Sequence, residues 1–247
     1  MSLSLQYKSL FSVYKRSTYI SIGLLGLQAL IGINAAKYYG PYMMQETGIT
    51  FENKSPDVSA LILNIPLAFV SLLGTFGNVF MIDRFGRRLI MLATLPPMAT
   101  FWVMAAVGTA FTGPEASEAS ASFGGITTIV SLYLFMLAFG LGISSTPWAI
   151  SAEIFPIHLV GTGNSLAATS NWISNALIAQ VFKCVSEVNV VSHVILYAGL
   201  GAVAFGTYFF VYYLVPETAG KSIEANLDEI VGKGHHEREQ AMLAQER

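Results

Sequence analysis

Long runs of apolar residues, separated by short polar segments, dominate the sequence. Six runs are long enough to cross a bilayer, because a spanning helix needs about 20 mostly apolar residues. They lie at 17–44, 57–82, 89–111, 124–150, 162–185 and 191–215. They do not alternate between apolar and polar positions, and each is far longer than the roughly 10 residues of a barrel strand. The pattern predicts an all-α membrane protein, a bundle of six transmembrane helices.

Polar segments at the two ends complete the organisation. Residues 1–16 precede the first apolar run, 17–215 hold all six runs, and 216–247 are hydrophilic. We therefore expect an N-terminal segment, a transmembrane bundle and a C-terminal tail. Residues 1–16 lack a short apolar core followed by a small-residue cleavage site, so they do not resemble a cleaved signal peptide.

The composition agrees with a lipid environment. Hydrophobic residues make up 53% of the chain and charged residues only 11%, whereas soluble domains carry about 25% charged residues. The formal net charge is −2 and no long basic tract occurs, so no nucleic-acid partner is expected. Cys184 is the only cysteine, which allows no internal disulfide or Cys-rich metal site. We expect no metal and no cofactor.

The positive charges predict the orientation, because short loops rich in Lys and Arg stay in the cytoplasm. Ten of these residues lie before the first run, between the second and third, or after the sixth: Lys8, Lys15, Arg16, Arg84, Arg87, Arg88, Lys221, Lys233, Arg238 and Arg247. Both termini are therefore expected to be cytoplasmic, in a protein of the plasma membrane. Lys37 lies inside the first run, and we expect its long side chain to reach outward to the interface.

The fifth run carries a polar stripe. Asn164, Asn171 and Asn175 are seven and four residues apart, which places them within about 40° on a helix. An asparagine facing lipid would leave its amide unpaired, so the stripe should face the bundle interior. Two roles remain open for it: hydrogen bonds that hold helices together, or the lining of a ligand site.

The first run contains Gln28 and Asn34, six residues apart with Gly32 between them. On an unbroken helix their side chains point about 120° apart. Both reach one ligand only if the helix breaks near Gly32, and broken helices in transporters mark binding sites. The alternative is a straight helix with two separate packing contacts.

The fourth run ends with Pro147 and Trp148. The proline removes one backbone hydrogen bond and predicts a kink. The tryptophan offers an apolar ring face and an N–H donor, which suit a sugar; an interfacial aromatic residue is the alternative. Side-chain amides both donate and accept hydrogen bonds, so amides beside an aromatic ring are typical of polyol recognition.

Catalytic sets are not evident in the apolar runs. His158 lies between two runs, His193 lies at the start of the sixth, and the tail carries His235 and His236 beside Glu237. We interpret the tail histidines as a solvated face and do not expect an enzyme.

Five motifs, in order, resemble the second half of the sugar porters of the major facilitator superfamily. They are residues 28–39 (QALIGINAAKYY), 83–88 (DRFGRR), 147–156 (PWAISAEIFP), 171–175 (NWISN) and 216–221 (PETAGK). Each is weak alone, but their order is specific and they cover the chain from about residue 19 to 230. The stretch from 162 to 175 is most similar to proton-linked inositol porters.

The resemblance implies one half of a twelve-helix transporter whose two bundles rock against each other. It implies sugar contacts at Gln28, Asn34, Trp148 and Asn175, to which the polar stripe adds Asn171 as a predicted substrate-binding residue. It also implies a cytoplasmic gate made of Asp83, Arg84, Arg87, Arg88, Glu153 and Glu217.

The departures from the family pattern bear on the cargo and the gate. Ala29, Ser71 and Gly140 replace residues that are polar or larger in many members, which suggests altered hexose binding. Val160 stands where the family usually has an arginine, so the gate is expected to lack one partner.

The predicted function is transport of a hexose, inositol or similar polyol, whether proton-coupled or facilitated. The partners would be the cargo, the bilayer and an N-terminal six-helix half that is missing or separate. The alternatives are a sugar sensor that does not transport and an inactive truncated half.

Overall fold

The computed structural model describes residues 1–113, 116–186 and 190–245, and these residues fold into helices without strands. In chain order the helices are α1 (Leu3–Ser12), α2 (Lys15–Leu30), α3 (Ile33–Tyr38), α4 (Gly40–Gln45), α5 (Pro56–Phe85), α6 (Arg87–Ala110), α7 (Glu118–Gly142), α8 (Thr146–Glu153), α9 (Val160–Ser186), α10 (Val190–Leu214), α11 (Ile223–Ile230) and α12 (His235–Gln245). The all-α prediction is confirmed.

The six predicted runs are all helical; the run at 17–44 forms α2, α3 and α4, the run at 124–150 forms most of α7 and α8, and each of the others forms one long helix. Five units are long and apolar enough to cross a membrane: Lys15–Tyr38, Pro56–Phe85, Arg87–Ala110, Glu118–Glu153 and Val190–Leu214. The sixth predicted run forms α9, which is 27 residues long. Its asparagines and hydroxyl side chains keep α9 below the apolarity of the other five.

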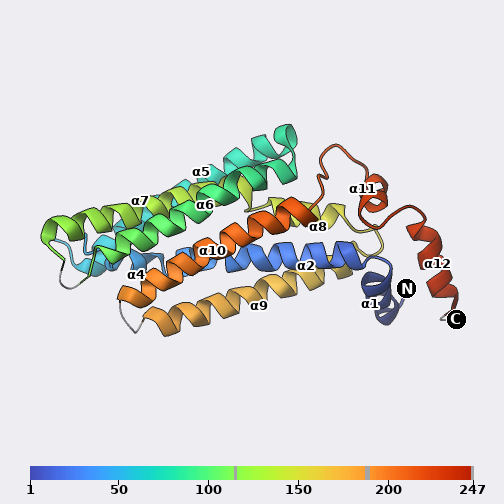
Figure 1. Ribbon diagram of the computed structural model, residues 1–247, viewed down its shortest axis with the longest axis horizontal. Coiled ribbons are helices and arrows are strands. Elements are labelled where there is room, and N and C mark those ends of the chain that lie inside the picture. The colour runs from blue at the N-terminus through green and yellow to red at the C-terminus, as the bar shows by residue number, and fades with distance from the viewer. Residues whose placement is uncertain (114–115, 187–189, 246–247) are drawn as a thin grey trace.

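The long helices lie side by side in one elongated bundle (Figure 1). Helix α6 packs between α10 and α7, α5 packs on the other side of α7, and α2 packs against α9. Both chain termini lie at the same end of the bundle, together with α1, α11 and α12 (Figure 1). We call this the terminal end; the opposite end holds α4, the last turns of α6 and α9 and the first turns of α7 and α10 (Figure 1).

Small residues set the spacing of α5 and α7. A Cβ atom built on Gly74 would lie 2.7 Å from the backbone oxygen of Leu137, and one on Gly140 would lie 2.8 Å from the Cα atom of Gly74. Only glycine allows the two backbones this approach. Gly140 therefore packs against α5, where a larger polar side chain would not fit.

Two of the long units are broken where the sequence contains Gly32 and Pro147. Helix α2 ends at Leu30, and Gly32 adopts a left-handed φ of 94° before α3 begins. The indole Nε1 of Trp102 donates to the backbone oxygen of Ile31 at 2.9 Å, which satisfies a carbonyl that the break leaves without a helical partner. The second break lies between Gly142 and Thr146, immediately before Pro147.

Candidate functional site

The five predicted substrate-binding residues line one partly open cavity of about 180 Å³. Gln28 and Asn34 come from the two sides of the first helix break, Trp148 from α8, and Asn171 and Asn175 from α9. The remaining lining residues are Ile33, Lys37, Phe139 and Ser144. The break at Gly32 thus brings Gln28 and Asn34 to one site, as the broken-helix interpretation requires.

A chain of hydrogen bonds joins the four amides of the cavity. Asn34 Nδ2 donates to Asn175 Oδ1 at 2.5 Å, and Asn175 Nδ2 donates to Asn171 Oδ1 at 3.0 Å. Asn171 Nδ2 donates to Gln28 Oε1 at 3.3 Å and to the backbone oxygen of Leu25 at 2.8 Å. Asn171 of the polar stripe therefore joins α9 to α2, and Asn171 and Asn175 line the cavity. Asn164, the third member, accepts from Ser151 Oγ of α8 at 2.5 Å instead.

Gln28 also donates hydrogen bonds to the backbone at the second helix break. Its Nε2 donates to the backbone oxygens of Ile143 and Ser144 at 2.7 and 2.8 Å. These carbonyls follow the end of α7 and lack helical partners. Gln28 is only 5% exposed, so its amide is committed to the protein before any ligand arrives.

Asn34 and Trp148 keep polar atoms available to the cavity. Asn34 is partly exposed, and within the described residues its Oδ1 accepts no hydrogen bond. The Trp148 side chain is 41% exposed, and its indole N–H likewise has no acceptor in the described part of the chain. One acceptor and one donor beside an aromatic ring face match the hydroxyl groups and apolar face of a polyol.

At the terminal end, Arg87 connects two helices. Its Nη2 lies 3.1 Å from Glu153 Oε1, and its Nη1 lies 3.6 Å from Asp83 Oδ1. The Asp83 side chain is 80% exposed, so that pair is screened by water and weak. Arg87 thus pairs with two other residues of the predicted gate, Asp83 and Glu153.

Glu217 contacts this cluster through the backbone. Its two oxygens accept from the backbone N–H groups of Arg87 and Arg88 at 2.9 and 3.0 Å. These donors open α6, where the helix leaves N–H groups without partners and favours a negative charge. Glu217 therefore caps α6 and fixes the segment after α10 to it.

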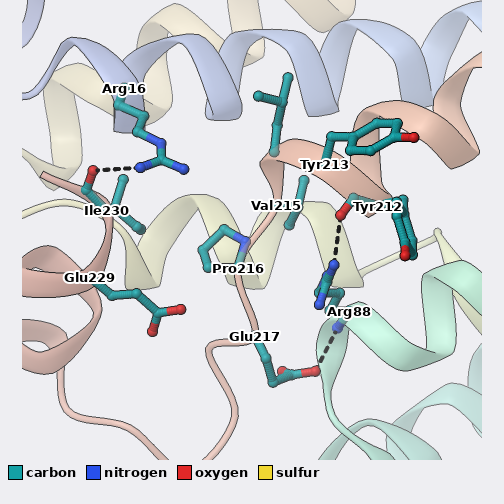
Figure 2. A pocket seen from close by; sticks show the side chains of 10 residues that line it. Arg16, Arg88, Tyr212, Tyr213, Val215, Pro216, Glu217, Glu229 and Ile230 are labelled. Atoms are coloured by element: carbon teal, nitrogen blue, oxygen red, sulfur yellow. Dashed lines mark hydrogen bonds between the residues drawn. The ribbon is translucent and has the colours of Figure 1, made fainter.

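Arg88 points toward the end of α10 (Figure 2). Its Nη2 donates to the backbone oxygen of Tyr212 at 2.6 Å, and its guanidinium carbon lies 5.8 Å from the centre of the Tyr212 ring. Arg16 donates to the backbone oxygen of Ile230 across the same pocket, whose volume is about 260 Å³. These contacts tie α2, α6, α10 and α11 together at the terminal end.

One predicted gate residue lies outside the network. The Arg84 guanidinium lies over the Phe85 ring at 5.7 Å and makes no ion pair within the described residues. Glu153 Oε2 is buried and has no partner in the described part of the chain, which agrees with the expectation that the gate lacks one cation.

A buried carboxylate in the tail forms a further cluster at the same end. Glu239 of α12 accepts from Ser9 Oγ at 2.8 Å and from Tyr14 OH at 2.9 Å, and it lies 2.8 Å from His158 Nε2. Burial alone would raise the pKa of Glu239, but the hydrogen bonds from His158, Ser9 and Tyr14 hold it below its ordinary value. Burial raises the pKa of Tyr14, and the hydrogen bond to Glu239 raises it further.

The interpretation of the tail histidines as a solvated face is wrong for His235. Its side chain is 3% exposed, its Nδ1 lies 3.4 Å from Asp228 Oδ1, and its ring packs edge-on against Tyr14. The docking of α12 beside α1 buries it. His236 is exposed, as expected.

Comparison with known families decides the identity of the bundle. The family described as "Sugar (and other) transporter" matches residues 2–227. The chain belongs to this family. It is a multi-pass integral membrane protein, and the sugar-porter resemblance is confirmed.

Named relatives of the chain are transporters. It is 32% identical over 206 residues to Membrane transporter D1 of Leishmania donovani, with 83% of this chain and 36% of the relative covered. It is 28% identical over 240 residues to Myo-inositol transporter 1 of Candida albicans, with 94% and 41% covered. The chain thus spans less than half the length of these relatives.

Solved structures show the same fold. The proton:xylose symporter XylE bound to 6-bromo-6-deoxy-D-glucose superposes with a TM-score of 0.71 at 23% identity, covering 86% of this chain and 42% of that one. An inward-open conformation of XylE from E. coli gives a TM-score of 0.64. The sugar porter chain therefore has the fold of half a major facilitator bundle.

Some site residues of this sugar porter were not found from the sequence. Ser144 and Phe139 line the cavity, but a serine and a phenylalanine in an apolar helix carry no signal of their own. The exposed Lys37, which was expected to reach the interface, also lines the cavity. The Glu239 cluster joins residues that are up to 230 positions apart, so no local pattern could indicate it.

Proposed function

We propose that this chain is the C-terminal six-helix half of a transporter that moves a monosaccharide or polyol by alternating access. The cavity supports the proposal most directly, because five residues predicted from sequence motifs come together there from three separate spans. Neutral amides suit such a site, since they hold hydroxyl groups without binding them too tightly for release.

The volume of the cavity indicates that it is one wall of a larger site. Small-molecule pockets usually measure about 300–1,000 Å³, whereas this one measures about 180 Å³. We infer that an N-terminal half supplies the facing wall. The central parts of the described spans contain no Asp or Glu, so a carboxylate for proton symport would also come from that half.

Hexoses and inositol are the proposed cargo. Relatives named for trehalose, polyol and myo-inositol transport are 28% identical to the chain. Their names agree with a hydroxyl-rich cargo but do not agree on one compound.

Uptake by the purified chain tests the division into halves. We expect no saturable uptake of labelled D-glucose or myo-inositol by liposomes that hold the chain as a monomer. Liposomes that hold it with an N-terminal half should take up at least one of them. Saturable uptake by a verified monomer would contradict the half-site proposal, and no uptake of either compound by the complete transporter would contradict the function.

We also propose that both termini face the cytoplasm at the plasma membrane. Tags placed at 45–56 and 112–122 should then be labelled from outside intact cells, and a tag after Arg247 should not. The opposite labelling pattern would reverse the orientation.

A further inference from the structure

Lys37 places a positive charge in the wall of the candidate cargo cavity. It lies in α3, one helical turn after Asn34, and lines the cavity with the amides. It also lines an adjoining hollow of about 220 Å³ between α3, α5 and α7, beside Asn64 and Ser71. A charged side chain within a membrane span is costly and usually has a functional partner.

That partner is not within the described part of this chain. Lys37 is exposed and makes no ion pair or hydrogen bond with residues 1–113, 116–186 or 190–245. No acidic residue is among those lining either hollow. In the adjoining hollow, Asn64 Oδ1 is also buried without a partner among the described residues. The two hollows therefore hold an ammonium and an amide oxygen whose hydrogen-bonding capacity is unused.

We propose that the cargo carries a carboxylate, as a sugar acid or polyol acid does, and that Lys37 binds it. This rests on the proposed transport function. The sugar ring would lie against Trp148 and Asn34, and the acid group would extend toward Lys37. A carboxylate matches a single ammonium in charge and forms short, charge-assisted hydrogen bonds with it. A phosphate dianion would leave an unbalanced negative charge in the same place.

The position of Lys37 favours a cargo over a carboxylate of the facing half. A lysine that only joined two bundles would need no access to the amide cavity, yet Lys37 shares a wall with Asn34 and Asn175. Its flexible stem and compact charge also suit an anion that must later leave.

Uptake by the complete transporter that carries this chain provides the test. Labelled D-glucuronate, D-glucose and glucose 6-phosphate would be compared in cells without endogenous uptake of these compounds. The variants are Lys37→Met, Lys37→Arg and, as a matched control at the same end of the bundle, Lys183→Met. Surface expression would be measured for each variant.

We expect the original protein to take up D-glucuronate with a KM about tenfold lower than that for D-glucose. Lys37→Met should remove this preference by raising the KM for D-glucuronate about tenfold, while Lys37→Arg should retain part of the preference and Lys183→Met all of it.

Four outcomes would overturn the inference. D-glucose uptake without D-glucuronate uptake would do so and leave the proposed function intact. Preference for glucose 6-phosphate would reject the carboxylate. Loss of all uptake in Lys37→Met despite normal surface expression would identify a partner in the facing half. No uptake of any of the three compounds by the original protein would also overturn the inference, and it would reject the proposed function as well if myo-inositol were not taken up either.

Discussion

In the central cavity four neutral amides bind one another beside Lys37, which has no partner among the described residues, whereas at the terminal end charged side chains hold helix ends and tail segments. The chain from Asn34 to Gln28 crosses from α3 to α9 and back to α2. The terminal clusters around Arg87 and Glu239 join elements that are far apart in sequence. Amides can exchange a protein partner for a hydroxyl group at little net cost, because both bonds are neutral. Charged clusters instead favour one arrangement of the helices until it changes as a unit.

Replacing Gln28 should give the largest effect on stability. Gln28→Ala leaves the buried oxygens of Ile143 and Ser144 without donors, and each unsatisfied group costs about 1–3 kcal/mol. We expect a loss of about 3 kcal/mol in the free energy of unfolding, together with weaker cargo binding, measured by denaturation of the complete transporter in detergent and by uptake. An unchanged free energy of unfolding would show that Gln28 contributes to cargo binding and not to stability. An unchanged half-saturation constant would show that its role is structural only.

Glu239→Gln tests the charged side of the comparison. The substitution keeps the shape of the side chain but replaces charge-assisted bonds by neutral ones, so the docking of α12 should weaken by about 1–2 kcal/mol. Amide hydrogen exchange in α12 should rise accordingly, whereas exchange in α9 should not change.

The same cluster has a predicted pH dependence. The folded pKa of Glu239 lies below its ordinary value, so its contribution is complete above the unfolded carboxyl pKa of about 4.3 and is lost as pH falls through the folded value. Acid should therefore release α12 in the original protein, and this loss should be absent in Glu239→Gln. Equal acid sensitivity in both proteins would assign it to another group.

Asn34→Ala should affect binding more than folding. Asn34 makes one side-chain hydrogen bond, to Asn175, and leaves Oδ1 toward the cavity. We expect the half-saturation constant for the cargo to rise about threefold to tenfold, with less loss of stability than in Gln28→Ala. A larger loss of stability in Asn34→Ala than in Gln28→Ala would contradict the distinction between Gln28 as a structural amide and Asn34 as a ligand-facing amide.

Arg87→Ala should have the smallest effect on stability. Its ion pairs are partly exposed, and such pairs contribute about 0.5–1 kcal/mol. If the cluster biases the two states of a transporter, maximal uptake should still fall, since the equilibrium between states moves. Arg84→Ala is the matched control, because Arg84 makes no ion pair in the described structure. Equal uptake in both variants and in the original protein would mean that the cluster is not a gate.

Much of this architecture could be predicted from the sequence because its signals are local. Apolar runs indicated the helices, and the stripe of Asn164, Asn171 and Asn175 indicated an interior face of α9. The six-residue spacing of Gln28 and Asn34 indicated that both side chains can reach one cavity only if the helix breaks near Gly32. The motifs also indicated Arg87, Glu153 and Glu217 as neighbours.

The unpredicted contacts depend on tertiary packing. The Gln28 amide binds the oxygens of Ile143 and Ser144, which are available only because α7 ends at Gly142. Glu239 and His235 are buried by the docking of α12, and a polar helix beside two histidines gives no sign of burial in the sequence. Arg84 and Arg88 are equally basic in the motif, yet only Arg88 reaches α10, because a helix break at Gly86 separates their directions.

The break at Gly32 has a mechanical consequence. It divides the first span into a rod anchored against α9 and a shorter lever that carries Asn34 and Lys37, with the left-handed glycine as the pivot between them. A small rotation about the two torsion angles of Gly32 swings both cargo-facing groups while Gln28 stays fixed to Ile143 and Ser144. Such a rotation would have to break the hydrogen bonds to α9 from Asn34 to Asn175 and from Tyr39 OH to the backbone oxygen of Ala179, so arrival of the cargo and movement of the lever would compete for the Asn34 amide.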